Sequence, residues 1–221
     1  MKLNNMMSQL TETAPRNITL PGHYISELPK DLPTHENSVY FQNQILTSLK
    51  GCPTKVDGDF KCFSNHLTSL EYGPTFVGGM YDCADNLLTT LKFSPKHIHK
   101  NFSCSHNSLE NLDYCPMEVN GSFICHTNKL TSLHDIHKHL RRIGGSFSCY
   151  SYASTKATHI LGLMLIDIGS TIVTEFGNGT DVDEILNKWK TGPNMKCINF
   201  WNIGCDRLIN DNTLRTWYII K

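Results

Sequence analysis

The chain has 221 residues and a mass of 25.0 kDa, enough to bury one sizeable core or two small ones. Its 20 lysines and arginines balance 20 aspartates and glutamates, so no net positive field would attract nucleic acid. The N-terminal residues lack the apolar core of a secretory signal, and the longest apolar stretch, ILGLMLIDI at 160–168, is far shorter than the ~20 residues of a membrane-spanning helix. We therefore expect a soluble cytoplasmic protein without nucleic-acid or membrane partners, whose nine cysteines are mostly reduced.

A repeat of 21 residues runs through the first two thirds of the chain. Four strings share one pattern: FKCFSNHLTSL, YDCADNLLTTL, FSCSHNSLENL and FICHTNKLTSL, which begin at residues 60, 81, 102 and 123. Seven columns recur at this period: an aromatic residue, a cysteine, an asparagine, two leucines, a proline and a β-branched residue. The cysteine and asparagine columns are Cys62, Cys83, Cys104, Cys125, Asn65, Asn86, Asn107 and Asn128. This regularity predicts stacked coils that share one core.

The coils upstream of residue 60 follow the pattern less closely. Phe41 and Leu46 fall in the expected columns, with Gln44 in place of asparagine. One further step back finds Ile25 and Leu28. The repeat therefore predicts a solenoid over 17–150 with an atypical first coil, and we expect residues 1–16 to form a flexible or capping segment.

Each coil is expected to contain one short strand. The aromatic residue and the cysteine are two positions apart, so Phe60 and Cys62 would point inward while Lys61 and Phe63 point outward. Cysteine would act as a small apolar filler, and the asparagines would form a ladder with backbone groups at the bend. The proline of each coil is expected to block strand continuation on the return path.

The last coil and the C-terminal region depart from the period. Phe147 and Cys149 lie 24 residues after their predecessors, so this coil carries three additional residues. We place them in one or two helical turns that bury Ile136, Leu140 and Ile143. Beyond the solenoid, residues 151–221 are expected to form a small, mainly helical capping domain, with helices near 181–190 and from about 194.

The pattern L-x-x-L-x-L-x-x-N-x-L, with aromatic, cysteine and asparagine variants, resembles a leucine-rich repeat array. More narrowly, FxCxxNxLTSLxxxPxxVxGxFxC is similar to the short-coil repeats of proteins from tailed bacteriophages related to the T-even group, and ILGLMLIDIG at 160–169 resembles a segment of the same proteins. The resemblance implies an α/β fold: a leucine-rich repeat solenoid with a short-stranded parallel β-sheet and a C-terminal cap. It also implies a protein encoded by a phage and active in the host cytoplasm.

The residue types that carry chemistry do not form a recognisable site. Eleven histidines suggest a metal, but no C-x-x-C pair occurs, and strand alternation would send Cys125 inward and His126 outward. A column of repeated cysteines is better explained as core filler than as a set of nucleophiles. We therefore predict no catalytic residue, no metal and no cofactor.

The outward face of the strands is the more informative surface. It combines small polar side chains with scattered large ones, the composition of an interface core. The residues predicted to bind a partner there are Tyr40, Lys61, Phe63, Met80, Asp82, Asp85, His106, Ile124, His126 and Tyr150.

These observations lead to three hypotheses about function. The first is a non-enzymatic protein-binding module, encoded by a phage, that binds or inhibits a protein of the bacterial host, including a protein of its anti-phage defence. The second is a structural accessory protein of the virion, and the third is an enzyme with its activity in the C-terminal domain. The sequence leaves the partner and the oligomeric state open.

Overall fold

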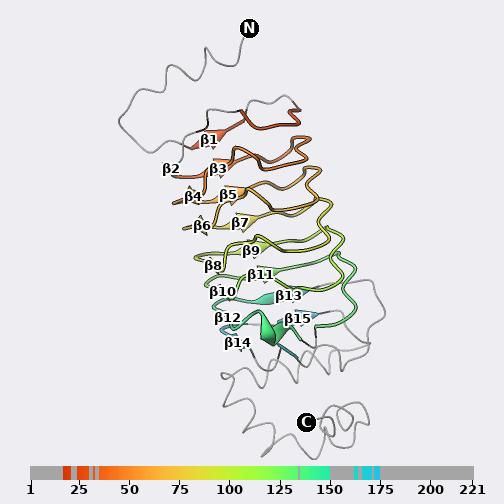
Figure 1. Ribbon diagram of the computed structural model, residues 1–221. Helices are drawn as coiled ribbons and strands as arrows, with labels where there is room; N and C mark the ends of the chain where they lie inside the picture. Colours follow the sequence, from red (N-terminus) through yellow and green to blue (C-terminus); the bar gives the residue numbers. More distant parts are fainter. Residues whose placement is uncertain are drawn as a thin grey trace, which may run out of the picture.

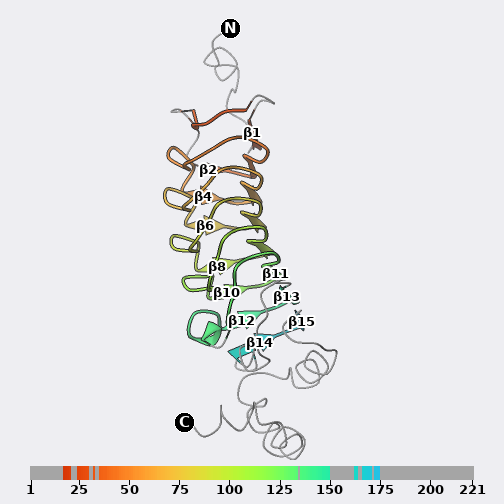
Figure 2. The same cartoon turned by 90° about the vertical axis from the view of Figure 1, so that its right-hand side faces the viewer.

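The computed structural model of the chain is a solenoid of stacked coils (Figures 1 and 2). It describes residues 17–20, 24–29, 32, 35–133, 135–149, 162–163, 166–170 and 172–174. Every strand pairs in parallel with the equivalent strand of the neighbouring coil. The parallel solenoid predicted from the 21-residue period is therefore confirmed.

The odd-numbered strands form one sheet of eight, in the order β1-β3-β5-β7-β9-β11-β13-β15. The strands are β1 (Ile18–Thr19), β3 (Val39–Tyr40), β5 (Phe60–Lys61), β7 (Tyr81–Asp82), β9 (Phe102–Ser103), β11 (Phe123–Ile124), β13 (Phe147–Cys149) and β15 (Ile172–Thr174). Their register aligns Phe60, Tyr81, Phe102 and Phe123 as direct neighbours. These rings are fully buried and lie in contact, with centroids 5.0–5.8 Å apart from coil to coil.

A second sheet of seven strands lies on the return path of the coils (Figure 1). Its strands are β2 (His35–Glu36), β4 (Lys55–Val56), β6 (Phe76–Val77), β8 (His97–Ile98), β10 (Glu118–Val119), β12 (Arg142–Ile143) and β14 (Asp167–Ile168). The expectation that proline blocks a strand here is wrong. Pro53 precedes the first strand residue, Lys55, by two positions, so the missing N–H of proline is not needed in the ladder. The column of Val56, Val77, Ile98 and Val119 provides the buried face of this sheet.

Helical structure is nearly absent from the described residues, so the predicted α/β class is wrong for this part of the chain. The longer coil contains a short 3-10 helix, η1 (Ile136–Lys138), which is one helical turn, the smaller of the two numbers expected. Ile136, Leu140 and Ile143 are buried as expected, with Ile136 in η1 and Ile143 in β12 of the second sheet. No helix in the described part of the chain is long and apolar enough to span a membrane.

Both sheets continue past residue 150. β12 pairs with β14 through Ile143 and Ile168, and β13 pairs with β15 through Phe147 and Ile172. These partners are 25 residues apart, and Ile172 and Thr174 stand where earlier coils have an aromatic residue and cysteine. The helices predicted near 181–190 and from about 194 lie outside the described residues.

The asparagines join successive coils through their side-chain amides. The Asn86 Nδ2 group donates to the carbonyls of Cys62, Cys83 and Ala84 at 3.0–3.3 Å, while its Oδ1 accepts the Leu67 N–H at 2.9 Å. Equivalent bonds surround Asn65, Asn107 and Asn128. Each asparagine therefore satisfies backbone groups of two coils at the bend after the first sheet.

Candidate functional site

The register of the eight-stranded sheet aligns several of the predicted binding residues across its outer face. Tyr40 pairs with Lys61, Lys61 with Asp82, Asp82 with Ser103, and Ser103 with Ile124. The ammonium group of Lys61 lies 5.4 Å from the centroid of the Tyr40 ring, within the range of a cation–π contact. Burial raises the pKa of Asp82, and the Ala84 N–H, the Ser103 side chain and the charge of Lys61 oppose this shift.

The large apolar residues predicted on this face do not form one continuous patch. Phe63 and Met80 lie on neighbouring coils, but the next coil presents Ser103 and Ser105, which are both buried. This polar coil separates the two residues from Ile124. The outer face therefore offers a smaller apolar area than the sequence suggested.

The remaining predicted residues lie toward the bend after the strands. Asp85 and His106 are exposed and have positive φ angles of 52°, and the Ser64 hydroxyl donates to Asp85 Oδ2 at 2.8 Å. The Nε2 atom of His126 lies 3.3 Å from the Ser148 hydroxyl. Tyr150 lies outside the described residues.

The thiols in the described residues are core groups. Cys62, Cys83, Cys104 and Cys125 are fully buried and unpaired by disulfides. Burial raises the pKa of each of them well above that of an ordinary thiol, and it raises the pKa of Cys115 to about 12. A thiolate is the nucleophilic form, so these groups are unsuited to nucleophilic catalysis. Within the described ranges, no cluster of three or more potential metal ligands occurs.

A column of exposed aromatic side chains lies at the turn that precedes the second sheet. Tyr72, Phe93 and Tyr114 are spaced by 21 residues and are 56%, 48% and 50% exposed. Their φ angles are 67°, 74° and 64°, in the left-handed region where glycine is favoured. Gly51 takes this position in the preceding coil, with φ of 96°. A bulky residue is strained in this conformation, and such strain is concentrated at functional sites.

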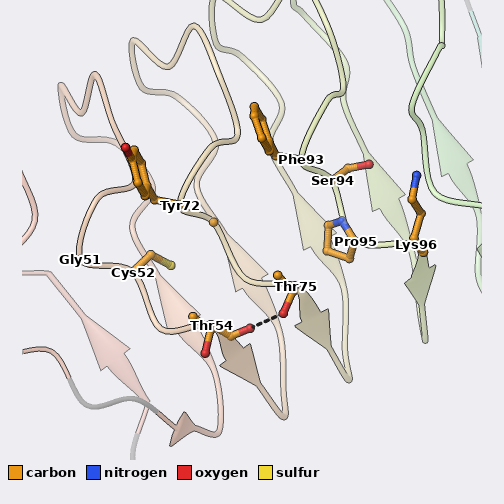
Figure 3. A pocket seen from close by; sticks show the side chains of 10 residues that line it. Gly51, Cys52, Thr54, Tyr72, Thr75, Phe93, Ser94, Pro95 and Lys96 are labelled. Carbon is orange, nitrogen blue, oxygen red and sulfur yellow. Dashed lines mark hydrogen bonds between the residues drawn. The ribbon is translucent and has the colours of Figure 1, made fainter.

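An open pocket of about 490 Å³ lies against this column. Figure 3 shows the rings of Tyr72 and Phe93 projecting from neighbouring coils in the same general direction, with Lys96 at one side. Gly51 and Gly73 also line the pocket. The Thr75 hydroxyl donates to the Thr54 carbonyl at 3.2 Å across the pocket wall (Figure 3).

This aromatic column was not predicted, although its 21-residue spacing is visible in the sequence. The three residues stand between the second leucine column and the proline column of their coils. Their exposure depends on the positive φ angles of the turn, which the order of residue types does not reveal. The comparisons add no further guide: no protein-family model, no curated protein and no solved structure matches the chain.

Proposed function

We propose that the protein is a non-enzymatic module that binds another protein through the surface of its solenoid. The observation that carries the proposal is the column of Tyr72, Phe93 and Tyr114, which exposes large apolar side chains at a fixed interval. Aromatic residues on a stiff scaffold lose little conformational freedom on binding and are enriched among binding hot spots. The burial of the described thiols favours the same proposal over a catalytic one.

The finer proposal is that the partner belongs to a bacterial host and that the chain is a leucine-rich repeat protein of phage origin. It rests on the resemblance of the cysteine, asparagine and leucine columns to the short-coil repeats of tailed phages. Inhibition of a host protein, including a defence protein, would follow from occupation of that protein's surface.

Affinity capture from a bacterial lysate, followed by reconstitution with the purified candidate, tests the proposal. We expect the wild-type protein to retain one protein specifically and to bind it in calorimetry. Tyr40→Ala combined with Phe63→Ala tests the outer face of the eight-stranded sheet, and Phe93→Gly tests the aromatic column. Leu87→Ala removes an exposed apolar side chain outside both surfaces and is the matched control.

Two results would contradict the proposal. One is that a captured protein binds every variant as tightly as it binds the wild type, since neither surface would then be used. The other is that the chain co-purifies with phage particles or turns over a substrate without binding any purified protein. Co-purification with phage particles would favour a virion accessory protein, and turnover of a substrate would favour an enzyme.

A further inference from the structure

We propose that the pocket beside Tyr72 and Phe93 binds a proline-rich segment of a partner protein, extended along the solenoid and carrying an acidic residue. This inference rests on the proposed function and specifies the chemistry of the partner. Proline-rich segments dock into grooves lined by aromatic side chains, because their preformed polyproline II conformation costs little entropy to bind.

The shape of the pocket is the first argument. It is lined by residues of three successive coils, from Gly51 and Cys52 through Tyr72 and Gly73 to Phe93 and Pro95. Neighbouring strands lie ~4.8 Å apart, so three coils span ~9.6 Å. One turn of a polyproline II helix advances ~9.3 Å in three residues. Residues i and i+3 of such a segment would therefore meet equivalent positions two coils apart.

The hydrogen-bonding groups at the pocket are the second argument. The Ser94 hydroxyl already donates to the Tyr114 carbonyl at 2.8 Å, and the Thr75 hydroxyl donates to Thr54. Within the part of the chain that the structure describes, neither the phenol of Tyr72 nor the ammonium of Lys96 makes a hydrogen bond or an ion pair. Both are free to donate. A proline-rich segment offers backbone carbonyls as acceptors and lacks the N–H groups that would need acceptors.

The charge around the pocket is the third argument. Lys96 lines the pocket, and the ammonium group of Lys92 lies 5.0 Å from the centroid of the Phe93 ring. Two cations therefore lie close to the pocket. An acidic residue beside the prolines would complement them and orient the segment.

The backbone of these coils makes strand addition an unsuitable alternative. The Thr75 N–H donates to the Thr54 carbonyl at 2.8 Å, and the Lys96 carbonyl accepts the Met117 N–H at 2.8 Å. These groups already join the coils, so the pocket presents no open strand edge to a peptide. Side-chain contact with the aromatic rings remains as the means of recognition.

The test uses a fluorescein-labelled nine-residue oligoproline with an aspartate at each end, titrated against the full chain by fluorescence anisotropy. We expect saturable binding that weakens about tenfold or more in Phe93→Gly, as expected for the loss of a hot spot, and is unchanged in Leu87→Ala. Lys96→Met should weaken binding of this peptide but not of its neutral analogue with asparagine at both ends. A peptide with alternate prolines replaced by glycine should bind more weakly.

Several outcomes would overturn the inference. One is that the glycine-containing peptide binds as tightly as the oligoproline, and another is that Phe93→Gly binds the oligoproline as tightly as the wild type does. A third is that the protein does not bind the peptide but binds a soluble glucan oligosaccharide saturably, in a way that depends on Phe93. Failure of the oligoproline to bind, while Phe93→Gly still abolishes capture of a protein partner, would reject the ligand class and leave the proposed function standing. Binding of the peptide at Phe93 without capture of any protein would support the ligand class and reject the proposed function.

Discussion

The hydroxyl oxygen of Tyr81 lies 3.4 Å from the position that a Cβ atom on Gly73 would occupy. Tyr81 stands in the inward row of phenylalanines, and its ring packs against Phe60 and Phe102. Its additional oxygen reaches the turn of the preceding coil, where Gly73 has no side chain. This oxygen is buried, and no hydrogen-bond partner is found for it among the described residues. The row of buried rings therefore approaches Gly73, which lines the surface pocket.

Replacement of Tyr81 by phenylalanine should leave the protein as stable as before or more stable. The variant keeps the stacked ring and removes a buried hydroxyl without a partner, so we expect the free energy of unfolding to stay the same or rise by about 1 kcal/mol. Urea denaturation measures this change. A loss of about 1 kcal/mol or more would mean that the hydroxyl makes a hydrogen bond in solution.

Gly73→Ala should destabilise the fold. The new Cβ atom would lie 3.0 Å from the Leu70 carbonyl oxygen and 3.1 Å from Leu49 Cδ1, contacts that require the surroundings to move. We expect a loss of about 1–3 kcal/mol, typical of an overpacked core. The loss should be smaller in the Tyr81→Phe background, and a double-mutant cycle measures this coupling. An equal loss in both backgrounds would show that the hydroxyl and Gly73 do not interact.

The asparagine ladder gives a prediction about stability alone. Asn86→Ala removes one acceptor and one donor group that together serve four backbone groups, so we expect a loss of about 1–3 kcal/mol. Asn120→Ala, at an exposed position, is the matched control and should change the melting temperature little. The idea fails if the two variants melt at the same temperature.

The sequence revealed the part of the fold that repeats in residue type. In every clear coil an aromatic residue and a cysteine are two positions apart, as Phe60 and Cys62 are, and this spacing was enough to predict the first parallel sheet. The second sheet could not be recognised in the same way, because a strand such as Lys55–Val56 contributes one buried residue, Val56, and has no second buried residue two positions away. The coil containing Ile168 and Ile172 escaped because its spacing is 25 residues and its cysteine and asparagine columns are absent.

The candidate site was less accessible to sequence reasoning than the fold. Alternation predicted the neighbours Tyr40, Lys61 and Asp82, but it did not reveal that Ser103 and Ser105 interrupt the apolar residues on that face. The exposure of Phe93 depends on a left-handed backbone conformation, which residue type alone would have assigned to glycine.

The core thiols should resist chemical modification in the folded protein. Burial raises the pKa of Cys83 and Cys104, so little thiolate is present and access to it is blocked. We expect peptides containing these residues to remain unlabelled by iodoacetamide at pH 8 in the native protein. Protein unfolded in guanidinium is the control and should be labelled quickly. Equally rapid labelling under both conditions would show that the column is exposed.

The charge of Asp82 should make stability depend on pH. Burial raises the pKa of Asp82 above its ordinary value of 3.8, so the folded state binds this proton more tightly than the unfolded chain does. The resulting stability is present below pH 3.8 and is lost as the pH rises through the folded-state pKa. Asp82→Asn should therefore melt at a higher temperature than the wild type at pH 7. The difference should narrow as the pH falls below 3.8, where the carboxyl group becomes mostly protonated in both states. A variant that is less stable at pH 7 would show that the ionised carboxylate is favoured in the fold.

Replacement of Phe93 by glycine should separate stability from binding. The φ angle of 74° is costly for phenylalanine, by roughly 1–2 kcal/mol for an L-residue in the left-handed region. Glycine adopts this angle freely, and the lost ring is 48% exposed, so its removal costs less packing than the removal of a buried ring would. We expect the melting temperature of Phe93→Gly to equal or exceed that of the wild type. Phe93→Ala keeps the strained backbone angle, so its melting temperature should not rise. Differential scanning calorimetry of the three proteins makes the comparison. If the ring is retained for binding, the more stable variant should also be the one that loses the partner. A marked fall in melting temperature for Phe93→Gly would instead show that the ring supports the fold.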